Sequence, residues 1–295
     1  MYDFKALYEA KSVDEAVRLR RGHPGARIIA GGSDVLIRIR DGKWAGAELI
    51  SIHGIDALRG VKLEDDGTIR IGPLTSFSHL ASDPVIGTHI PVLAEAANQV
   101  GSPQIRNIGT IGGNICNGSP AADTPPTLFA LDAQVELTGT EGARRVPVRD
   151  FYIRAGVVDL KPDELLTAVL VPGEAYRGYT GHYIKYAMRE ALDISVVSCS
   201  VNVKLTEDKK RIENVRAAFG AVGPVPLRTP GAEAAARGGE TTERTVKAFA
   251  SAVLGEISPW SDWRTSKAFR EHIAEELAAR ALIRSIELGG GGIHA

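Results

Sequence analysis

Cysteine is scarce in this sequence. Only two cysteines occur, Cys116 and Cys199, and they form no CxxC pair. This excludes a four-cysteine zinc site and an iron–sulfur cluster ligated by cysteines of this chain alone. It also fits a reducing cytoplasm, where we expect the protein to reside. The seven histidines show no HxH, HExxH or HxxxH spacing, so we predict no metal in this chain.

The sequence also lacks a charge of one dominant sign and a long apolar run. Its 35 basic residues nearly balance its 36 acidic residues, which gives a net charge of -1. Without a basic excess or interleaved aromatic residues, we predict no nucleic-acid partner. No run approaches the roughly 20 apolar residues of a membrane span, and the charged N-terminus MYDFKALYEA is no signal peptide. We therefore predict no membrane partner.

Three familiar motifs are missing as well. The chain has no GxGxxG for a nicotinamide Rossmann site, no GxxxxGK[ST] for an ATP P-loop and no GxSxG for a hydrolase nucleophile. Strands and helices do not alternate in the βαβαβ manner of a Rossmann fold. These absences remove the commonest phosphate-binding and hydrolytic sites from consideration.

What the sequence does contain is a mixture of strand and helix patterns, in a chain long enough for two or three lobes. A possible capping box at Ser12 and Glu15 opens a first helix, and Asp66-Gly67 is a strong hairpin signal. We expect a loop at 101–126 and a linker at 172–181. Expected strands are 27–30, 48–52, 61–73 as a hairpin, 133–139, 164–172, 194–205 and 211–222. Expected helices are 12–20, 35–42, 76–100 with breaks near Pro84 and Pro91, 242–256 and 265–288.

Two glycine pairs are the candidate binding elements. RIIAGGSD (27–34) places Gly31-Gly32 between a strand and a helix start, and TIGGN (110–114) places Gly112-Gly113 in the glycine-rich segment. Backbone N–H groups without a Cβ in the way are good phosphate donors, and a helix start adds its dipole. For each segment alone, a plain turn explains the sequence equally well.

Several polar side chains accompany these glycines. Ser33 can donate to a phosphate, whereas Asp34 would repel one, so Asp34 is assigned to a helix cap or a sugar hydroxyl. Thr110 and Asn114 can hydrogen-bond a phosphate or a sugar oxygen. Asp123 can accept a hydrogen bond from a sugar hydroxyl or cap the following helix, and the two roles are compatible.

The order of these segments resembles a known family. RIIAGGSDVLIRIRDG, SPQIRNIGTIGGNICNGSPAADTPPTLFALDAQVEL, HYIKYAMREALDISVVS and WRTSKAFREHI are similar to the FAD-binding (medium) subunit of xanthine dehydrogenase-type molybdenum hydroxylases. The resemblance covers nearly the whole chain. It implies an α+β fold with a two-lobed PCMH-type FAD-binding domain at 1–176 (lobes of about 1–55 and 56–176). A C-terminal α+β domain at 177–288, with a small antiparallel sheet and helices, and a flexible tail at 289–295 would follow.

The resemblance also implies which residues contact FAD. Both glycine segments would hold the pyrophosphate, Leu165 would lie beside the cofactor, and Lys185 and Arg189 would lie near the isoalloxazine ring. From the residues alone, Lys185 and Arg189 are solvated charges at a strand end. Val100 stands about where vertebrate relatives stack an aromatic ring on the flavin. The implied contacts are Arg27, Ile28, Ile29, Ala30, Gly31, Gly32, Ser33, Asp34, Val100, Thr110, Ile111, Gly112, Gly113, Asn114, Asp123, Leu165, Lys185 and Arg189.

The implied function is electron transfer by an oxidoreductase subunit that has no catalytic acid or base of its own. Electrons would come from [2Fe-2S] clusters in a small subunit, after a large subunit with the molybdenum cofactor has oxidised a purine, and would pass to NAD+. Ser33 stands where carbon monoxide and aromatic-type relatives tend to have histidine, which favours the purine type. Alternatives are a medium subunit of another hydroxylase (aldehyde, nicotinate, carbon monoxide or aromatic), a flavin-fold binding protein without a redox role, and a stand-alone covalent-flavin oxidase.

Overall fold

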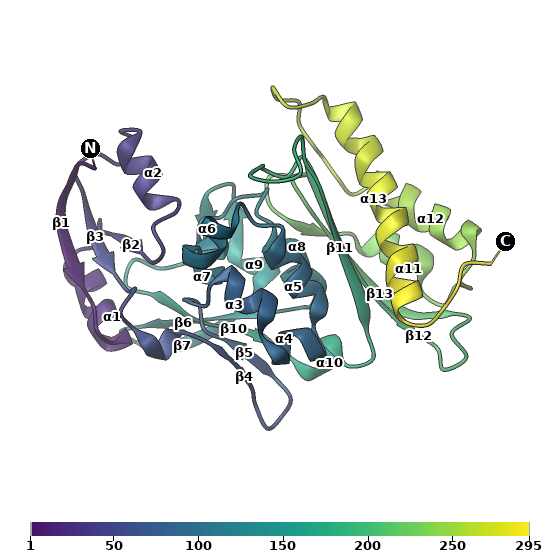
Figure 1. The fold of residues 1–295 in the computed structure, drawn as a ribbon, viewed down its shortest axis with the longest axis horizontal. Helices are drawn as coiled ribbons and strands as arrows, with labels where there is room; N and C mark the ends of the chain where they lie inside the picture. Colours follow the sequence, from purple (N-terminus) through teal and green to yellow (C-terminus); the bar gives the residue numbers. More distant parts are fainter. Residues whose placement is uncertain (1, 295) are drawn as a thin grey trace.

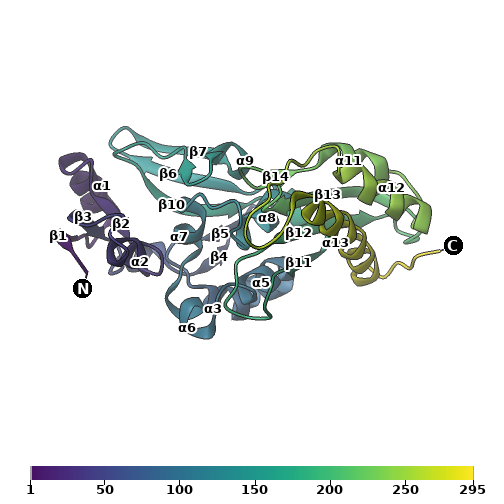
Figure 2. The same cartoon turned by 90° about the horizontal axis from the view of Figure 1, so that it is seen from above.

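The computed structural model describes residues 2–294 and arranges them as three units in chain order (Figure 1). Each unit has its own sheet, and the middle unit lies between the other two in both views (Figures 1 and 2). Buried apolar side chains form three clusters, one centred on each unit. Within the described part of the chain, no helix is both long and apolar enough to cross a membrane.

The first unit is a three-stranded parallel sheet in the order β1-β3-β2. The capping prediction is confirmed, because the Ser12 hydroxyl accepts the Glu15 N–H at 3.1 Å. The edge strand β1 was not predicted; its side chains are largely exposed, so its sequence carries little apolar alternation. The elements are β1 (Phe4–Glu9), α1 (Val13–Gly22), β2 (Arg27–Ile29), α2 (Val35–Arg40) and β3 (Ala47–Ser51).

The second unit is a five-stranded antiparallel sheet in the order β4-β5-β10-β6-β7, covered by short helices. The hairpin and the breaks at Pro84 and Pro91 are confirmed, and each of these prolines starts a helix. Its main strands are β4 (Val61–Leu63), β5 (Ile69–Ile71), β6 (Gln134–Gly139), β7 (Gly142–Pro147) and β10 (Leu165–Val171), beside a small pair β8 (Tyr152–Arg154) and β9 (Val157–Val158). Its helices are α3 (Phe77–Ser82), α4 (Pro84–His89), α5 (Pro91–Asn98), α6 (Pro103–Ile108), α7 (Ile111–Cys116), α8 (Thr124–Ala130) and α9 (Val148–Phe151), with a 3-10 turn at Asp56–Leu58.

The expected loop at 101–126 is wrong in detail, because α6, α7 and the start of α8 lie in it. Ser102 and Thr110 cap the first two of these helices, accepting the N–H groups of Ile105 and Gly113. A proline begins α6 and two more lie in the first turn of α8. Each helix has only six or seven residues, too few for the apolar period to be recognised in the sequence.

The third unit packs three helices on one face of an antiparallel sheet in the order β11-β12-β13-β14 (Figure 1). This confirms the expected small antiparallel sheet with helices and, with the other units, the α+β fold. A one-turn helix and the first residues of a strand occupy the expected linker at 172–181. The elements are α10 (Gly173–Tyr176), β11 (Thr180–Tyr186), β12 (Val197–Leu205), β13 (Ile212–Gly220), β14 (Leu227–Arg228), α11 (Pro230–Ala236), α12 (Glu243–Val253) and α13 (Lys267–Leu288).

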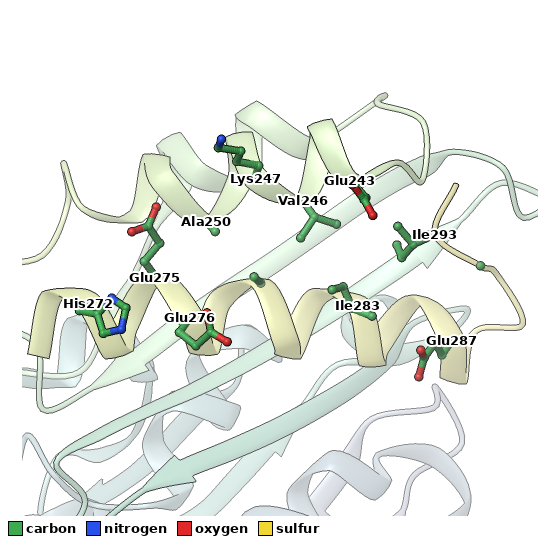
Figure 3. A pocket seen from close by; sticks show the side chains of 12 residues that line it. Glu243, Val246, Lys247, Ala250, His272, Glu275, Glu276, Ile283, Glu287 and Ile293 are labelled. Atoms are coloured by element: carbon green, nitrogen blue, oxygen red, sulfur yellow. The ribbon is translucent and has the colours of Figure 1, made fainter. Parts of the chain in front are cut away.

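The segment after α13 turns back along the third unit. Gly291 N–H donates to Ile286 O, and His294 exchanges backbone hydrogen bonds with the start of α12 through Thr241 and Glu243. These contacts hold most of the segment for which we expected flexibility; Ala295 lies outside the described residues. A hollow of about 670 Å³ lies between this segment, α12 and α13, with Val246 and Ile283 among its apolar lining (Figure 3).

Candidate functional site

The first glycine loop leaves four backbone donors free. Strand β2 ends at Ile29, Gly32 turns the chain with φ +72°, and α2 starts at Val35. Such a positive φ favours glycine. Among residues 2–294, no acceptor takes the N–H groups of Gly31, Gly32, Ser33 and Asp34. The loop therefore offers a row of unpaired donors of the kind that binds an anionic group.

The second glycine loop is built differently. The N–H groups of Ile111 and Gly112 donate to Thr75 O at 3.1 Å and to Pro73 O at 2.9 Å, and Gly113 N–H donates to the Thr110 hydroxyl. A Cβ on Gly112 would lie 2.5 Å from Pro73 Cβ, so this glycine is needed for packing on the protein. What this loop can still offer a ligand is the Thr110 hydroxyl proton and the Asn114 side-chain NH₂.

The two loops lie against each other. A Cβ placed on Gly31 would come within 1.8 Å of Ile108 O, two residues before Thr110. Real side chains do not approach a carbonyl oxygen so closely, so only glycine permits this contact. Segments separated by about eighty residues in the sequence thus meet at one place, as the sequence predicted, although Gly31 contacts protein backbone rather than open space.

Asp34 lies at the N-cap position of α2, but its side chain makes no cap hydrogen bond. Its carboxylate instead accepts from Arg38 Nε at 2.7 Å, while Arg38 Nη2 donates to Asn117 Oδ1 at 2.8 Å. Arg38 therefore joins the first loop to the end of the helix that begins at the second loop. Arg38 was not predicted as a site residue, although Asp34 and Arg38 have the i, i+4 spacing of a helical ion pair.

The second loop continues toward Asp123. Thr124 donates its hydroxyl proton to Asn114 Oδ1 at 2.7 Å, which fixes Asn114 beside the start of α8. Asp123 makes no cap hydrogen bond either. Its two carboxylate oxygens accept from the Tyr183 hydroxyl at 3.0 Å and from Lys185 Nζ at 2.9 Å.

This Asp123–Lys185 pair is buried. The exposed fractions of the two side chains are 9% and 6%, so the interpretation of Lys185 as a solvated surface charge is wrong. Burial raises the pKa of Asp123, and the charge and hydrogen bond of Lys185 oppose that effect. Burial and the neighbouring Asp123 also raise the pKa of Tyr183, which stays a neutral donor. Tyr183 was missed, although it lies two residues from Lys185 on β11 and so shares its face of the sheet.

Lys185 and Arg189 line one hollow of about 400 Å³, together with Gln99 and the 186–193 loop. Lys185 Nζ also donates to Gln99 O at 3.0 Å. Arg189 is two-thirds exposed and is held inside its own loop by Leu192 O and Asp193. The larger hollow of Figure 3 is lined by none of the expected FAD contacts and lies in the third unit, so we place the candidate site at the smaller one.

The remaining expected contacts are mostly apolar and partly hidden. Val100 and Leu165 are buried in two different hydrophobic clusters, and neither lines the hollow beside Lys185. Leu165 belongs to the cluster of the first unit although it lies on β10, so it joins the first two units. Arg27 stacks over Trp44 at 4.6 Å. Ile28 and Ala30 pack against the hydrophobic cluster of the first unit, and Ile111 is fully buried in that of the second unit. Ile29 is half-buried.

The whole arrangement fits an elongated ligand with an anionic centre. Unpaired N–H groups at the first loop suit a diphosphate, and the buried carboxylate of Asp123 suits a hydroxyl further along. The cations Lys185 and Arg189 at the far end suit a ring that gains negative charge on reduction. FAD has these three parts in this order. No three histidine, cysteine or acidic side chains gather as a metal site anywhere in residues 2–294.

Two family models match the chain. Residues 2–174 match the FAD binding domain in molybdopterin dehydrogenase, and residues 182–285 match the CO dehydrogenase flavoprotein C-terminal domain. The first match covers the two units that carry both glycine loops. The second covers the unit that carries Lys185 and Arg189.

Similar proteins agree with these matches. The xanthine dehydrogenase FAD-binding subunit of Escherichia coli O157:H7 is 35% identical over 294 residues, covering 100% of both chains. The glyceraldehyde dehydrogenase medium chain of Sulfolobus acidocaldarius is 31% identical over 272 residues, covering 92% of this chain and 95% of that one. A solved carbon monoxide dehydrogenase from Hydrogenophaga pseudoflava, lacking the Mo-pyranopterin moiety, superposes with a TM-score of 0.92 at 31% identity, covering 98% and 99%. The chain therefore belongs to the family of FAD-binding medium subunits of molybdenum hydroxylases of the xanthine dehydrogenase type.

Proposed function

We propose that this chain is the electron-transfer subunit of a xanthine dehydrogenase-like complex in the cytoplasm. Its partners are a small subunit that carries [2Fe-2S] clusters and a large subunit that carries the molybdenum cofactor and oxidises a purine. FAD bound to this chain takes electrons from the clusters and passes them to NAD+. The FAD-binding domain spans 1–176 with lobes of about 1–55 and 56–176, and the C-terminal domain spans 177–288.

One observation carries the proposal: contacts and the short chain segments between them join the free donors of the first loop to Lys185. This path runs from Gly31 against Ile108, through Asn114 and Thr124, to the buried Asp123–Lys185 pair. A protein that merely packed three domains together would not need unpaired donors at one end of such a path and a buried charge pair at the other.

Each part of the path has its own task. The N–H groups of Gly31 through Asp34 bind the diphosphate, with help from the hydroxyls of Ser33 and Thr110. Asp123 accepts a hydrogen bond from a ribityl or ribose hydroxyl with its remaining lone pairs. Lys185 and Arg189 place positive charge beside the ring, which favours its reduced state and tunes its potential.

The choice of a purine over other substrates rests on sequence identity to subunits of the different hydroxylases. The xanthine dehydrogenase subunit is 35% identical to this chain, compared with 31% for the glyceraldehyde, 32% for a carbon monoxide and 30% for the nicotinate subunit. Because this chain holds no residue that acts on the substrate carbon, its structure favours none of these substrates. An aldehyde, nicotinate, carbon monoxide or aromatic hydroxylase is the alternative.

The test is purification of the complex at native expression level. We expect FAD, iron and molybdenum in one assembly, with NAD+ reduction that depends on xanthine or hypoxanthine. The same assembly with activity only on aldehydes, nicotinate or carbon monoxide would replace the purine proposal by its alternative. Bound FAD that NADH cannot reduce, in a chain without metal-bearing partners, would contradict the electron-transfer role.

A further inference from the structure

Arg38 occupies an unusual position between the two glycine loops. It lies on α2 in the first unit, and its guanidinium is bound from three sides. Nε donates to Asp34 at 2.7 Å, Nη2 donates to Asn117 at 2.8 Å, and Cζ stacks 4.8 Å from the centre of the Trp44 ring. Arg27, the first residue of the glycine loop's strand, stacks on the same ring at 4.6 Å.

Both hydrogen-bond partners of Arg38 lie at the loops themselves. Asp34 is the last residue of the first loop, and Asn117 ends α7, the helix that begins with Ile111 of the second loop. The backbone of Asn117 is itself held in place, because its N–H donates to Gly113 O at 3.0 Å. A displacement of the first unit relative to the second would therefore break the Arg38–Asn117 bond.

The geometry points to Arg38 as a positioning residue: we propose that it latches the two glycine loops at the spacing that FAD requires. A planar guanidinium fixed by a carboxylate, an amide oxygen and an aromatic face has few remaining orientations. A ligand held by both loops binds more tightly when their spacing is set beforehand, because it does not have to order them. Trp44 and Asp34 orient the Arg38 side chain, and Asn117 Oδ1 accepts its hydrogen bond across the two loops.

The test compares FAD affinity among variants of the full-length chain freed of flavin, by quenching of flavin fluorescence. Arg38→Met keeps the stem over Trp44 but removes both hydrogen bonds. Asn117→Leu keeps the charge of Arg38 and its bond to Asp34 but removes the acceptor across the loops. We expect each to raise the Kd for FAD by about tenfold, the size of one charge-assisted hydrogen bond. Because they cut the same contact, the double variant should be no weaker than either single one.

Two controls separate the latch from simpler explanations. Arg40→Met removes an equal charge from the same helix, where Arg40 forms an exposed ion pair with Asp41, and should leave the Kd within about twofold. Asn117→Asp keeps the acceptor and should retain wild-type affinity. Thermal midpoints of the flavin-free variants report stability separately, and they should change far less than the affinity.

Three results would overturn the inference. Weak binding by Arg38→Met with normal binding by Asn117→Leu would mean that Arg38 acts by charge on the diphosphate, not as a latch. Normal FAD affinity in both variants would mean that the contact has no effect on binding. Loss of folding in both variants would mean that the Arg38–Asn117 contact is needed for folding and not specifically for FAD binding. None of these depends on the substrate of the complex, and failure of the wild-type chain to bind FAD would instead contradict its place in the family.

Discussion

At the scale of single residues, the buried Asp123–Lys185 pair is the feature that most needs explanation. A charge pair away from water is costly to form and still more costly to break, because the survivor has no partner. Asp123 uses both oxygens on Tyr183 and Lys185, so the pair is well satisfied. We interpret it as a charge pair kept for its effect on the cofactor, not for stability.

Replacing Lys185 by methionine should lower the free energy of unfolding at pH 7 by about 3 kcal/mol, because Asp123 is left buried and charged. Burial already raises the pKa of Asp123, and this variant raises it further. An acid with a raised pKa in the folded state binds its proton more readily there, so the deficit should shrink as the pH falls from 7 toward 4. Urea unfolding at several pH values measures this.

The matched control is Lys204→Met, which breaks an exposed pair with Glu213 on the neighbouring strand and should have little effect. Adding Asp123→Asn to Lys185→Met should restore most of the lost stability. A Lys185→Met protein that unfolds like the wild type at pH 7 would show that the pair is not buried in solution.

Some residue roles could be predicted from the sequence and others could not. The glycine pairs and Asp123 were candidates from the residues themselves, Lys185 was found through the resemblance, and the cap at Ser12 through local spacing alone. The burial of Lys185 was not foreseeable, because it depends on Asp123 and Gln99, which come from other elements. The reason for Gly31 was also different from the one expected, since its neighbour Ile108 is distant in sequence.

At the scale of elements, the contact of Gly31 with Ile108 sets how closely β2 and α6 approach. Gly31→Ala should force the two loops apart, since its Cβ would overlap Ile108 O at 1.8 Å. Overpacking of this kind costs about 1–3 kcal/mol, so FAD affinity should fall by about tenfold or more. Gly25→Ala is the matched control, with no atom within 4 Å of the new Cβ. Titration with FAD measures both, and equal affinities would refute the importance of this contact.

A second element-level device anchors α13. Asp262, in the segment before the helix, accepts from Arg264 at 2.6 Å and from the fully buried Arg270 at 2.9 Å. Arg270 also donates to Val196 O and stacks 4.9 Å from the centre of the Trp260 ring. Partial burial alone would raise the pKa of Asp262, but the hydrogen bonds and charges of the two arginines outweigh it and hold this pKa well below its ordinary range.

The sign of the pH effect follows from that depressed pKa. The Asp262 contacts stabilise the fold fully above the ordinary pKa of aspartate, near 4, and lose their effect as the pH falls below it. Asp262→Asn should therefore be less stable than the wild type at pH 7, and the difference should narrow below about pH 4. Thermal midpoints between pH 3 and 7 test this. A difference that stays constant, or widens in acid, would contradict the assigned pair.

The helices and strands were predictable where they are long or are bounded by clear turn or cap residues. The two long strands of the third unit, β12 and β13, its two long helices and the hairpin at Asp66-Gly67 were predicted. The failures were short or exposed. Strand β7 reads GARRVP, and its arginines pair with Glu136 and Glu164 instead of forming an apolar stripe. Helices α6 and α7 begin at the caps Ser102 and Thr110, and in the sequence these residues are equally typical of turns.

At the scale of the whole molecule, three units with separate cores are joined at the site. The first two meet where Gly31 touches Ile108 and where Leu165 enters the first cluster. The third joins through Lys185 and Tyr183 on Asp123. A ligand that lies along this path contacts all three units, so its binding should stabilise the molecule as a whole.

The most direct test of this account is amide hydrogen exchange of the full-length chain with and without FAD. The N–H groups of Gly31 through Asp34 have no acceptor within residues 2–294, so without FAD they should exchange quickly. With FAD we expect strong protection of 27–34, together with protection of 110–123. If FAD binds but both glycine segments exchange as before, and protection falls instead on α12 and α13, the central claim is contradicted.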